Sequence, residues 1–356
     1  PYERLDRNQR GVVDRSPLAA DRHTHRDREE HQMTDPRFIG AIKSSPMGFG
    51  SWAIGGPFSA PDGQPAGWGQ VDDDESIAAI RAAFDGGITL FDTANVYGTG
   101  HAERVLARAL AGRRDQIVLA TKWGNTMNEA TKVLDGADGS VASMRRSLEG
   151  SLDRLATDHV DLFQFHLNDY DGPEIDDLRE ALEDLVAEGK IRAYGWSTDH
   201  PDRAQRWLSG PNFKAVQAEI NVLQDNPGIW EVAESNQLAC LNRGPLAMGL
   251  LTGKYKPDTK IGPDDVRGAS PEWLRFFVDG VPSPEYLRRL DAIREVLTSG
   301  GRSLVQGAIA WLWGRSPTAI PIPGVRTVAQ AKENAAAMTH GPLTAAQIQE
   351  VAELLE

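Results

Sequence analysis

The feature that most constrains the fold of this chain is an eightfold alternation of short apolar or β-branched runs with amphipathic stretches, which begins near Met47. Amphipathic stretches of about ten to fifteen residues between such runs are typical of βα units, whose strands pair in parallel. The expected strands are residues 46–50, 88–92, 117–121, 160–166, 191–197, 215–220, 239–243 and 319–323. The expected helices are residues 74–84, 101–110, 143–155, 175–188, 202–208, 229–236, 303–313 and 328–337. Eight consecutive units predict an α/β protein of the (β/α)8 TIM-barrel class.

One barrel accounts for most of the chain. Its 356 residues fit a single domain, because α/β barrels routinely exceed about 250 residues. Three pieces fall outside the eightfold pattern: a Pro/Gly/charged segment at 256–284, a helix near 285–297 and a C-terminal helix from Thr344. We therefore expect a barrel over residues 37–356, with a long loop after strand 7 and extra C-terminal helices.

The N-terminal segment has a different composition. Residues 1–32 are dense in Arg, Asp, Glu and His and have too few apolar residues to build a core, so residues 1–36 are predicted to be a disordered tail. Its histidines lack a fixed scaffold for a metal, and no metal site is predicted. Met33 suggests a natural start there, with an upstream extension before it. N-terminal sequencing of native material that begins well before Met33 would contradict this hypothesis.

Composition excludes several classes of partner. A formal net charge of -13 disfavours binding to nucleic acid or acidic lipid, although a local basic pocket for a phosphorylated cofactor is compatible with it. The single Cys240 cannot form an intrachain disulfide, which fits the cytoplasm. No apolar stretch approaches the roughly 20 residues of a membrane span, and no signal core is present. We expect a cytoplasmic protein that acts on a small molecule; its oligomeric state is unknown from the sequence.

Titratable residues interrupt the ends of three consecutive expected strands. Asp92 ends the second strand, Lys122 follows the third and His166 ends the fourth, while Tyr97 lies five residues beyond Asp92 in the next loop. In a (β/α)8 barrel all four face the C-terminal rim, where such enzymes place their active sites. Each residue alone has an ordinary structural explanation, such as a turn cap or half-buried packing. Together, the four indicate a catalytic set.

This combination suits proton donation to a carbonyl oxygen that receives a hydride. A tyrosine hydroxyl has an ordinary pKa of about 10, and the ammonium of Lys122 is expected to lower the pKa of Tyr97. Asp92 would pair with Lys122 and hold it in place. His166 would hydrogen-bond the carbonyl oxygen and assist the proton relay.

Three segments resemble the signatures of the aldo-keto reductase family. Residues 88–98, which end in the Asp, Tyr and Gly of the first signature, are followed by Glu103. Residues 151–166 resemble the second signature and residues 321–334 the third, so that the resemblance runs from about Arg37 to the C-terminus. The resemblance implies hydride transfer from NADPH to an aldehyde or ketone, with sugars among the candidate substrates. It also implies that the cofactor binds without a Rossmann domain.

The resemblance also implies where NADP(H) binds. Ser197 and Gln217 are assigned to the nicotinamide carboxamide, and Arg326 to the 2′-phosphate, because a guanidinium forks onto phosphate oxygens near a helix N-terminus. This assignment favours NADPH over NADH. The full set that the resemblance implies for cofactor binding is Gly50, Ser51, Trp52, Asp92, Ser197, Thr198, Gln217, Arg243, Gly244, Pro245, Leu246, Gly249, Leu250, Gly253, Lys254, Pro323, Gly324, Arg326, Gln330, Glu333 and Asn334.

The chain departs from the family pattern at two positions. Many members have Asn after the serine of the fifth strand, whereas this chain has Thr198 and then Asp199, which implies rearranged nicotinamide contacts. Arg243 stands where many members have an aromatic ring. Its planar guanidinium either stacks on the nicotinamide in place of that ring or contacts phosphate.

Aromatic residues are expected around the substrate. Trp52 and Trp123 are predicted to wall the pocket. Trp273, Phe276 and Phe277 of the long loop either close over it or anchor the loop. Such walls suit a sugar, an aryl aldehyde or a ketone alike.

Two other functions are compatible with parts of this pattern. A nucleotide-sensing regulatory subunit of a membrane protein, with little turnover, is the alternative, but sensing alone would not need a complete tetrad with His166. A Schiff-base aldolase would use Lys122 as its nucleophile. It requires a depressed Lys122 pKa, whereas Asp92 would stabilise the ammonium.

Overall fold

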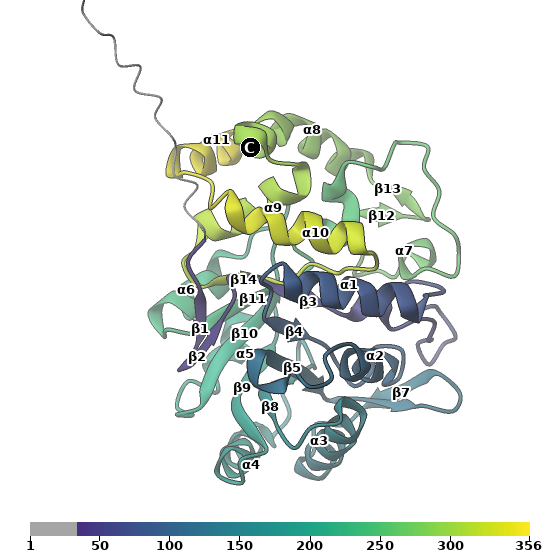
Figure 1. Ribbon diagram of the computed structural model, residues 1–356, viewed down its shortest axis with the longest axis vertical. Helices are drawn as coiled ribbons and strands as arrows, with labels where there is room; N and C mark the ends of the chain where they lie inside the picture. The colour runs from purple at the N-terminus through teal and green to yellow at the C-terminus, as the bar shows by residue number, and fades with distance from the viewer. Residues whose placement is uncertain (1–33) are drawn as a thin grey trace, which may run out of the picture. The chain divides into compact units, whose positions relative to one another are not determined.

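The computed structural model describes residues 34–356, in which eight parallel strands form a barrel (Figure 1). The strands follow one another around the barrel in chain order, and the first and last meet where Gly50 N donates to Pro323 O at 2.9 Å. The predicted (β/α)8 barrel is therefore confirmed. Its strands are β3 (Gly48–Gly50), β4 (Leu90–Asp92), β5 (Val118–Trp123), β8 (Val160–Phe165), β9 (Ile191–Ser197), β10 (Phe213–Glu219), β11 (Ala239–Arg243) and β14 (Ala319–Pro321).

Eight α-helices follow the strands. They are α1 (Asp73–Asp85), α2 (His101–Ala109), α3 (Val141–Leu155), α4 (Ile175–Ala187), α5 (Pro201–Gln205), α6 (Pro227–Ser235), α9 (Leu304–Arg315) and α10 (Val328–Ala336). Several begin at side-chain caps: Asp72 accepts from two amides at the start of α1, and Ser303 forms a capping box with Gln306 in α9. A helix was expected over residues 202–208, but α5 is shorter and ends at Gln205.

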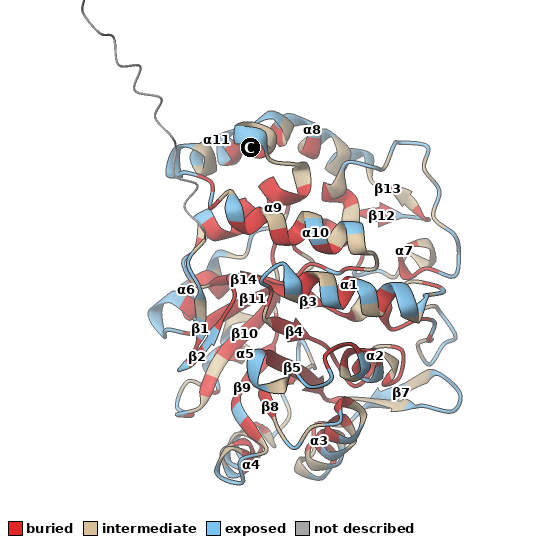
Figure 2. Ribbon diagram, viewed as in Figure 1, coloured by how far each residue is buried: buried red, intermediate tan, exposed pale blue. Residues whose placement is uncertain are grey.

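The remaining elements lie outside the eightfold repeat. Helices α8 (Pro284–Thr298) and α11 (Ala345–Leu355) pack on α9, which explains why α9 is buried along most of its length (Figure 2). The long loop after β11 contains α7 (Val266–Ala269) and a hairpin of β12 (Phe277–Val278) and β13 (Val281–Pro282). The 3-10 helices are η1 (Trp52–Ile54), η2 (Arg114–Gln116), η3 (Ala247–Thr252), η4 (Ser299–Gly301) and η5 (Ala337–Thr339).

Besides the β12–β13 hairpin of the long loop, two hairpins were not predicted. Strands β1 (Arg37–Ile39) and β2 (Ile42–Ser44) pair antiparallel. Their residues Ile39 and Ile42 pack with strand residues such as Leu90 in the core inside the barrel, while the larger core lies between the strands and the helices. Strands β6 (Asn125–Asn128) and β7 (Val133–Ala137) form the second hairpin, directly after β5. The first hairpin thus completes the barrel core, and the second follows the strand that carries Lys122.

Most of the predicted tail, residues 1–33, lies outside the described residues. The described chain begins with Thr34, whose backbone amide donates to Met338 O at 2.9 Å. Over residues 34–356, no helix combines the length and apolar character needed to cross a membrane.

Candidate active site

The four predicted catalytic residues meet at the C-terminal ends of neighbouring strands. Asp92 ends β4, Lys122 is the second-last residue of β5, and His166 directly follows β8. Lys122 Nζ donates to Asp92 Oδ2 at 2.5 Å and lies 3.4 Å from Tyr97 Oη. A third bond runs from Lys122 Nζ to the Thr93 carbonyl at 2.8 Å. The ammonium is fully buried and held by three oxygen atoms at once.

Asp92 is fixed by a network that the sequence did not reveal. Its second oxygen, Oδ1, accepts from Gln164 Nε2 at 3.1 Å and from Gln217 Nε2 at 2.9 Å. The two amides are joined by a bond from Gln217 Nε2 to Gln164 Oε1 at 3.1 Å. Gln164 could have been suspected, because it is one of only two polar residues, with Asp161, in this fully buried strand. The network holds Asp92 in the position that pairs with Lys122.

Burial sets the proton equilibria of the site. It raises the pKa of Tyr97, and the nearby charge of Lys122 only partly opposes this shift. Burial alone would lower the pKa of Lys122, but Asp92 and Tyr97 outweigh it and leave that pKa raised. The expectation that Lys122 brings the pKa of Tyr97 below its ordinary value is therefore wrong in net direction. At neutral pH Tyr97 keeps its proton, as a proton donor must.

His166 is neutral for the same reason. Burial, followed by the charges of Lys122 and Arg243, places its pKa well below the ordinary value. Its ring lies edge-on to that of Tyr97, with centroids 6.0 Å apart, and both residues line the same cavity. The backbone amide of His166 donates to Trp123 O at 2.7 Å, but its Nδ1 has no hydrogen-bond partner among the described residues. A neutral ring with an unpartnered nitrogen is suited to bind a polar ligand atom.

The loop that carries Tyr97 is packed against its neighbours. Gly98 adopts a φ of +61°, and a Cβ at this position would lie 1.7 Å from the Gly55 carbonyl oxygen, so only glycine permits the approach. Lys132, in the turn of the β6–β7 hairpin, donates to Gly98 O at 3.1 Å. The hairpin and the loop after β3 therefore both contact the segment that positions Tyr97.

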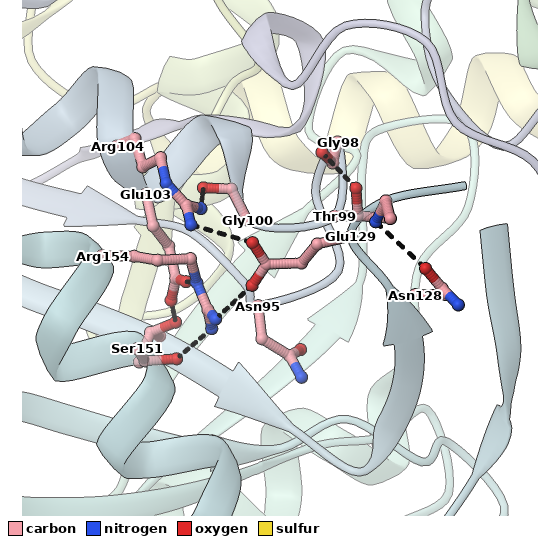
Figure 3. Close-up of polar contacts among 12 residues, drawn as sticks. Asn95, Gly98, Thr99, Gly100, Glu103, Arg104, Asn128, Glu129, Ser151 and Arg154 are labelled. Atoms are coloured by element: carbon pink, nitrogen blue, oxygen red, sulfur yellow. Dashed lines mark hydrogen bonds and ion pairs between the residues drawn. The ribbon is translucent and has the colours of Figure 1, made fainter. Parts of the chain in front are cut away.

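Figure 3 shows the ion pairs that hold the β6–β7 hairpin against the helices. Glu129 in its turn accepts from Arg104 Nη2 of α2 at 2.8 Å and from Arg154 Nη1 of α3 at 2.9 Å. Arg154 Nε also donates to Glu103 Oε2 at 2.6 Å. Glu103 is fully buried, and its other oxygen accepts from Thr121 Oγ1 at 2.6 Å. This network links two helices and strand β5 to the hairpin.

A cavity of about 660 Å³ opens at this end of the barrel. Trp52 stacks on Tyr97 with ring centroids 6.1 Å apart, and Trp68 meets Trp52 edge-on at 5.4 Å. Phe58 and Leu134 complete an apolar wall beside the tetrad. The space is within the usual size of ligand sites, about 300–1,000 Å³.

The aromatic residues predicted to wall the pocket divide into two groups. Trp52 and the half-exposed Trp273 line the cavity, with their ring centroids 6.4 Å apart. Trp123 does not, because its ring is fully buried and stacks on Phe165 at 4.5 Å; that prediction is wrong. Phe276 and its neighbour Phe277 are also fully buried and anchor the long loop.

The structure brings together most of the residues assigned to the cofactor. Those that line the cavity are Gly50, Ser51, Trp52, Asp92, Ser197, Gln217, Arg243, Gly244, Pro245, Leu246, Gly249, Lys254, Gly324, Arg326, Gln330, Glu333 and Asn334. Four others do not line it: Thr198, Leu250, Gly253 and Pro323. Thr198 is buried and donates its hydroxyl to Asn168 O at 2.6 Å. Leu250 is fully buried, which suits a packing role.

The unpartnered polar atoms that line the cavity are of the types that a dinucleotide would bind. Ser51 Oγ, Gln217 Oε1 and Asn334 Nδ2 are buried without hydrogen-bond partners in the described part of the chain, and all three residues line the cavity. They are a donor-acceptor hydroxyl, an amide acceptor and an amide donor, types that match a carboxamide, a ribose or an adenine. At Gly50 a Cβ would meet the Ile322 carbonyl oxygen at 2.7 Å, so a side chain is excluded from this part of the wall.

Arg326 already has partners. Its Nη1 donates to Trp68 O at 2.9 Å and its Nη2 to Gln70 O, while its backbone amide donates to Gln330 Oε1 at 2.8 Å. Its guanidinium therefore lies at the cavity edge between α10 and the loop before α1.

Charged residues that the sequence did not assign also line the cavity. Asp199, Glu219 and Arg267 are the main examples. Arg267 pairs with Asp265 and lies over the ring of Trp68 at 4.5 Å, so it ties the long loop to the opposite side of the mouth. No group of three or more His, Cys, Asp or Glu side chains within residues 34–356 is arranged to hold a metal.

The chain was compared with known proteins. The model of the aldo/keto reductase family matches residues 46–356. Aldo-keto reductase YhdN of Bacillus subtilis is 32% identical, over 81% of this chain and 83% of its own. The L-glyceraldehyde 3-phosphate reductase of Escherichia coli K12 is 31% identical, over 77% of this chain and 82% of its own.

Solved structures give the same answer. A glycerol dehydrogenase from Gluconobacter oxydans superposes with a TM-score of 0.76 at 31% identity and covers 90% of this chain and 95% of its own. The holo form of an aldo-keto reductase from Bacillus halodurans superposes with a TM-score of 0.73 at 27% identity. The match covers 91% of this chain and 97% of that structure. With the barrel, the assembled tetrad and a family match over residues 46–356, the chain belongs to the aldo/keto reductase family.

Proposed function

We propose that this protein reduces an aldehyde or ketone with NADPH, and that Tyr97 is the general acid. The observation that carries the proposal is the buried contact of Lys122 with both Asp92 and Tyr97, at the base of a cavity that His166 also lines. When bound, NADPH supplies the hydride. The residues of the chain supply the proton and the binding energy.

Tyr97 Oη donates its proton to the carbonyl oxygen as charge develops there. Lys122 donates a hydrogen bond to the phenolate that is left behind, and this charge-assisted bond is stronger than the one made to the neutral hydroxyl. The stabilisation therefore grows during the reaction, which is what catalysis requires. Asp92 keeps the ammonium in place and acts as a positioning residue.

His166 orients the carbonyl. Because its imidazole is neutral, one ring nitrogen carries a proton that it can donate to the carbonyl oxygen, beside Tyr97. Two donors aimed at one oxygen fix the carbonyl and stabilise the negative charge that forms on it.

The cofactor contacts follow the cavity lining. Ser197 and Gln217 are proposed to bind the nicotinamide amide, and Gln217 offers an unpartnered oxygen for it. Asn334 at the other end offers an unpartnered amide nitrogen for the adenosine. Arg326 is proposed to exchange its two carbonyl partners for the 2′-phosphate, to which a guanidinium binds more strongly.

The geometry argues against the Schiff-base aldolase. Lys122 Nζ donates to three oxygens and has a raised pKa, whereas a nucleophilic lysine must lose its proton. Borohydride trapping of a substrate on Lys122 would revive that function.

The test is a survey of NADPH oxidation with aldehydes and ketones. It should include glyceraldehyde, its 3-phosphate, aryl aldehydes and simple ketones, since named relatives act on glycerol and on L-glyceraldehyde 3-phosphate. We expect turnover with at least one class. Tight NADPH binding without oxidation by any carbonyl would instead favour the nucleotide-sensing subunit.

A further inference from the structure

The two departures from the family pattern meet through Asp199, which follows Thr198 in the first departure and contacts Arg243, the second. Arg243, at the end of β11, forms an ion pair through Nη2 with Asp199 Oδ2. Its Nη1 lies 3.5 Å from Glu219 Oε2 at the end of β10. All three side chains line the cavity beside Ser197 and Gln217. They form one charged cluster, which we call the Asp199–Arg243–Glu219 cluster.

The cluster is held rigidly. Asp199 Oδ1 accepts from the backbone amide of Glu219 at 2.7 Å, and the amide of Asp199 donates to Asn168 Oδ1 at 2.8 Å. Asn226 Nδ2 donates to the Asp199 carbonyl at 2.9 Å. Because the carboxylate is fixed by backbone and side-chain bonds, its charge cannot swing away into solvent.

The charges act on the reacting centre. Burial is the main cause of the shifted pKa values of Tyr97 and His166, and the guanidinium of Arg243 is near enough to contribute to both, in the direction that lowers the pKa. The hydride must be delivered to a carbonyl carbon whose oxygen contacts those two residues. A charge felt by both of them is therefore also felt by the nicotinamide ring that delivers the hydride.

We propose that the Asp199–Arg243–Glu219 cluster sets the relative affinity of the site for oxidised and reduced nicotinamide. The proposal rests on the proposed function. The oxidised ring carries a positive charge and the reduced ring is neutral, so a nearby cation weakens binding of the oxidised form only, and a nearby anion strengthens it. Arg243 thus favours NADPH over NADP+, and the two carboxylates oppose it.

The sign of each contribution can be tested separately. In Arg243→Gln the carboxylates lose their partner, and we expect the ratio Kd(NADP+)/Kd(NADPH) to fall by about three- to tenfold. In Asp199→Asn, whose amide oxygen can still accept from the Glu219 amide, the guanidinium is less compensated. There the same ratio should rise by about the same factor. Both constants are measured by fluorescence titration and calorimetry on the full chain.

Two kinds of control separate electrostatics from structure. Arg243→Lys keeps the charge and should restore a ratio near that of the wild type. Arg206 and Asp171 form a comparable ion pair at 2.8 Å and do not line the cavity. Arg206→Gln and Asp171→Asn should therefore leave both constants and turnover unchanged.

The outcomes are distinct. If both affinities fall together in Arg243→Gln and Asp199→Asn and the ratio stays constant, the cluster is only structural and the inference is overturned. In that case NADPH-dependent reduction by the wild type would leave the proposed function intact. A wild-type chain that binds neither form of the cofactor would overturn both.

Discussion

At position 97 a single oxygen atom carries the proposed chemistry. Tyr97→Phe removes the hydroxyl that contacts Lys122 but keeps the ring that stacks on Trp52. We expect kcat for carbonyl reduction to fall by about 10²–10⁴-fold, with NADPH affinity changed by no more than about twofold. Turnover is followed by NADPH absorbance and binding by fluorescence. Tyr286→Phe, in α8, is the matched control, and near-normal turnover of Tyr97→Phe would overturn the assignment.

The pH dependence follows from the same residue. Reduction requires protonated Tyr97, whose pKa is raised by burial, so the rate should stay level through neutral pH and fall only in strongly alkaline solution. Oxidation of the alcohol requires the ionised form and should increase as the pH rises. His166, whose pKa is well below its ordinary value, should add no transition near neutrality. Rate profiles in both directions check this, and a reduction rate that halves near pH 6.5 would contradict the neutral state of His166.

Arg326 tests the choice of cofactor. Arg326→Ala should raise the Kd for NADPH much more than that for NADH, because only NADPH carries the 2′-phosphate. The exposed Lys332 lies on the same helix, α10. Lys332→Ala removes one positive charge nearby and should change neither constant appreciably. An equal loss of affinity for both cofactors in Arg326→Ala would show that this guanidinium does not contact the 2′-phosphate.

Residues were predictable where a strand end fixed their direction. The tetrad could be found because consecutive parallel strands bring their carboxyl ends to one rim. Trp123 was misplaced, although strand alternation would have corrected it: Lys122 points into the barrel mouth, so the next side chain points toward the helices. The Asp199–Arg243 pair was not predictable, since its partners are 44 residues apart, at or just beyond the ends of strands that are not adjacent in the barrel, and no local pattern links them.

At the scale of elements, the buried pair of Glu103 and Arg154 joins α2 to α3. Glu103→Gln would leave the nearly buried guanidinium of Arg154 without its inner carboxylate. We expect the free energy of unfolding to fall by about 3–5 kcal/mol, measured by urea denaturation. Glu129 is half exposed, and Glu129→Gln should cost less than about 1 kcal/mol. Equal effects of the two substitutions would contradict this ranking.

The β6–β7 hairpin shows that a local sequence pattern does not reveal an element that depends on contacts with distant residues. The barrel strands are buried on both faces and therefore appear in the sequence as continuous apolar runs, which is why they could be predicted. Strands β6 and β7 are partly exposed and rich in polar or small residues. They are held from outside by the backbone of Ser59 and by Arg104 and Arg154, which bind Glu129 in the hairpin turn. The same dependence on distant partners applies to the long loop, where Arg267 lies over the ring of Trp68 at 4.5 Å and the Val266 amide donates to Gly67 O at 2.8 Å.

At the scale of the whole molecule, the predicted family, the barrel and the NADP(H)-dependent oxidoreductase class are confirmed by the family match over residues 46–356. The two ends of the barrel differ in role. The N-terminal end is filled by the β1–β2 hairpin, whereas the C-terminal end keeps a cavity of about 660 Å³. This cavity includes Gly50 and Gly324, which pair where the first and last strands of the barrel meet.

A ligand in that cavity should therefore stabilise the barrel as a unit. A cofactor present at about 100 times its Kd adds about 2.7 kcal/mol if it binds only the folded chain. For a domain of this size we expect Tm to rise by about 3–5 °C with NADPH. In Arg326→Ala the shift at the same concentration should be smaller, whereas Lys332→Ala should keep it. Differential scanning calorimetry over a series of NADPH concentrations measures it, and a Tm that is independent of concentration would show that NADPH does not bind the folded barrel.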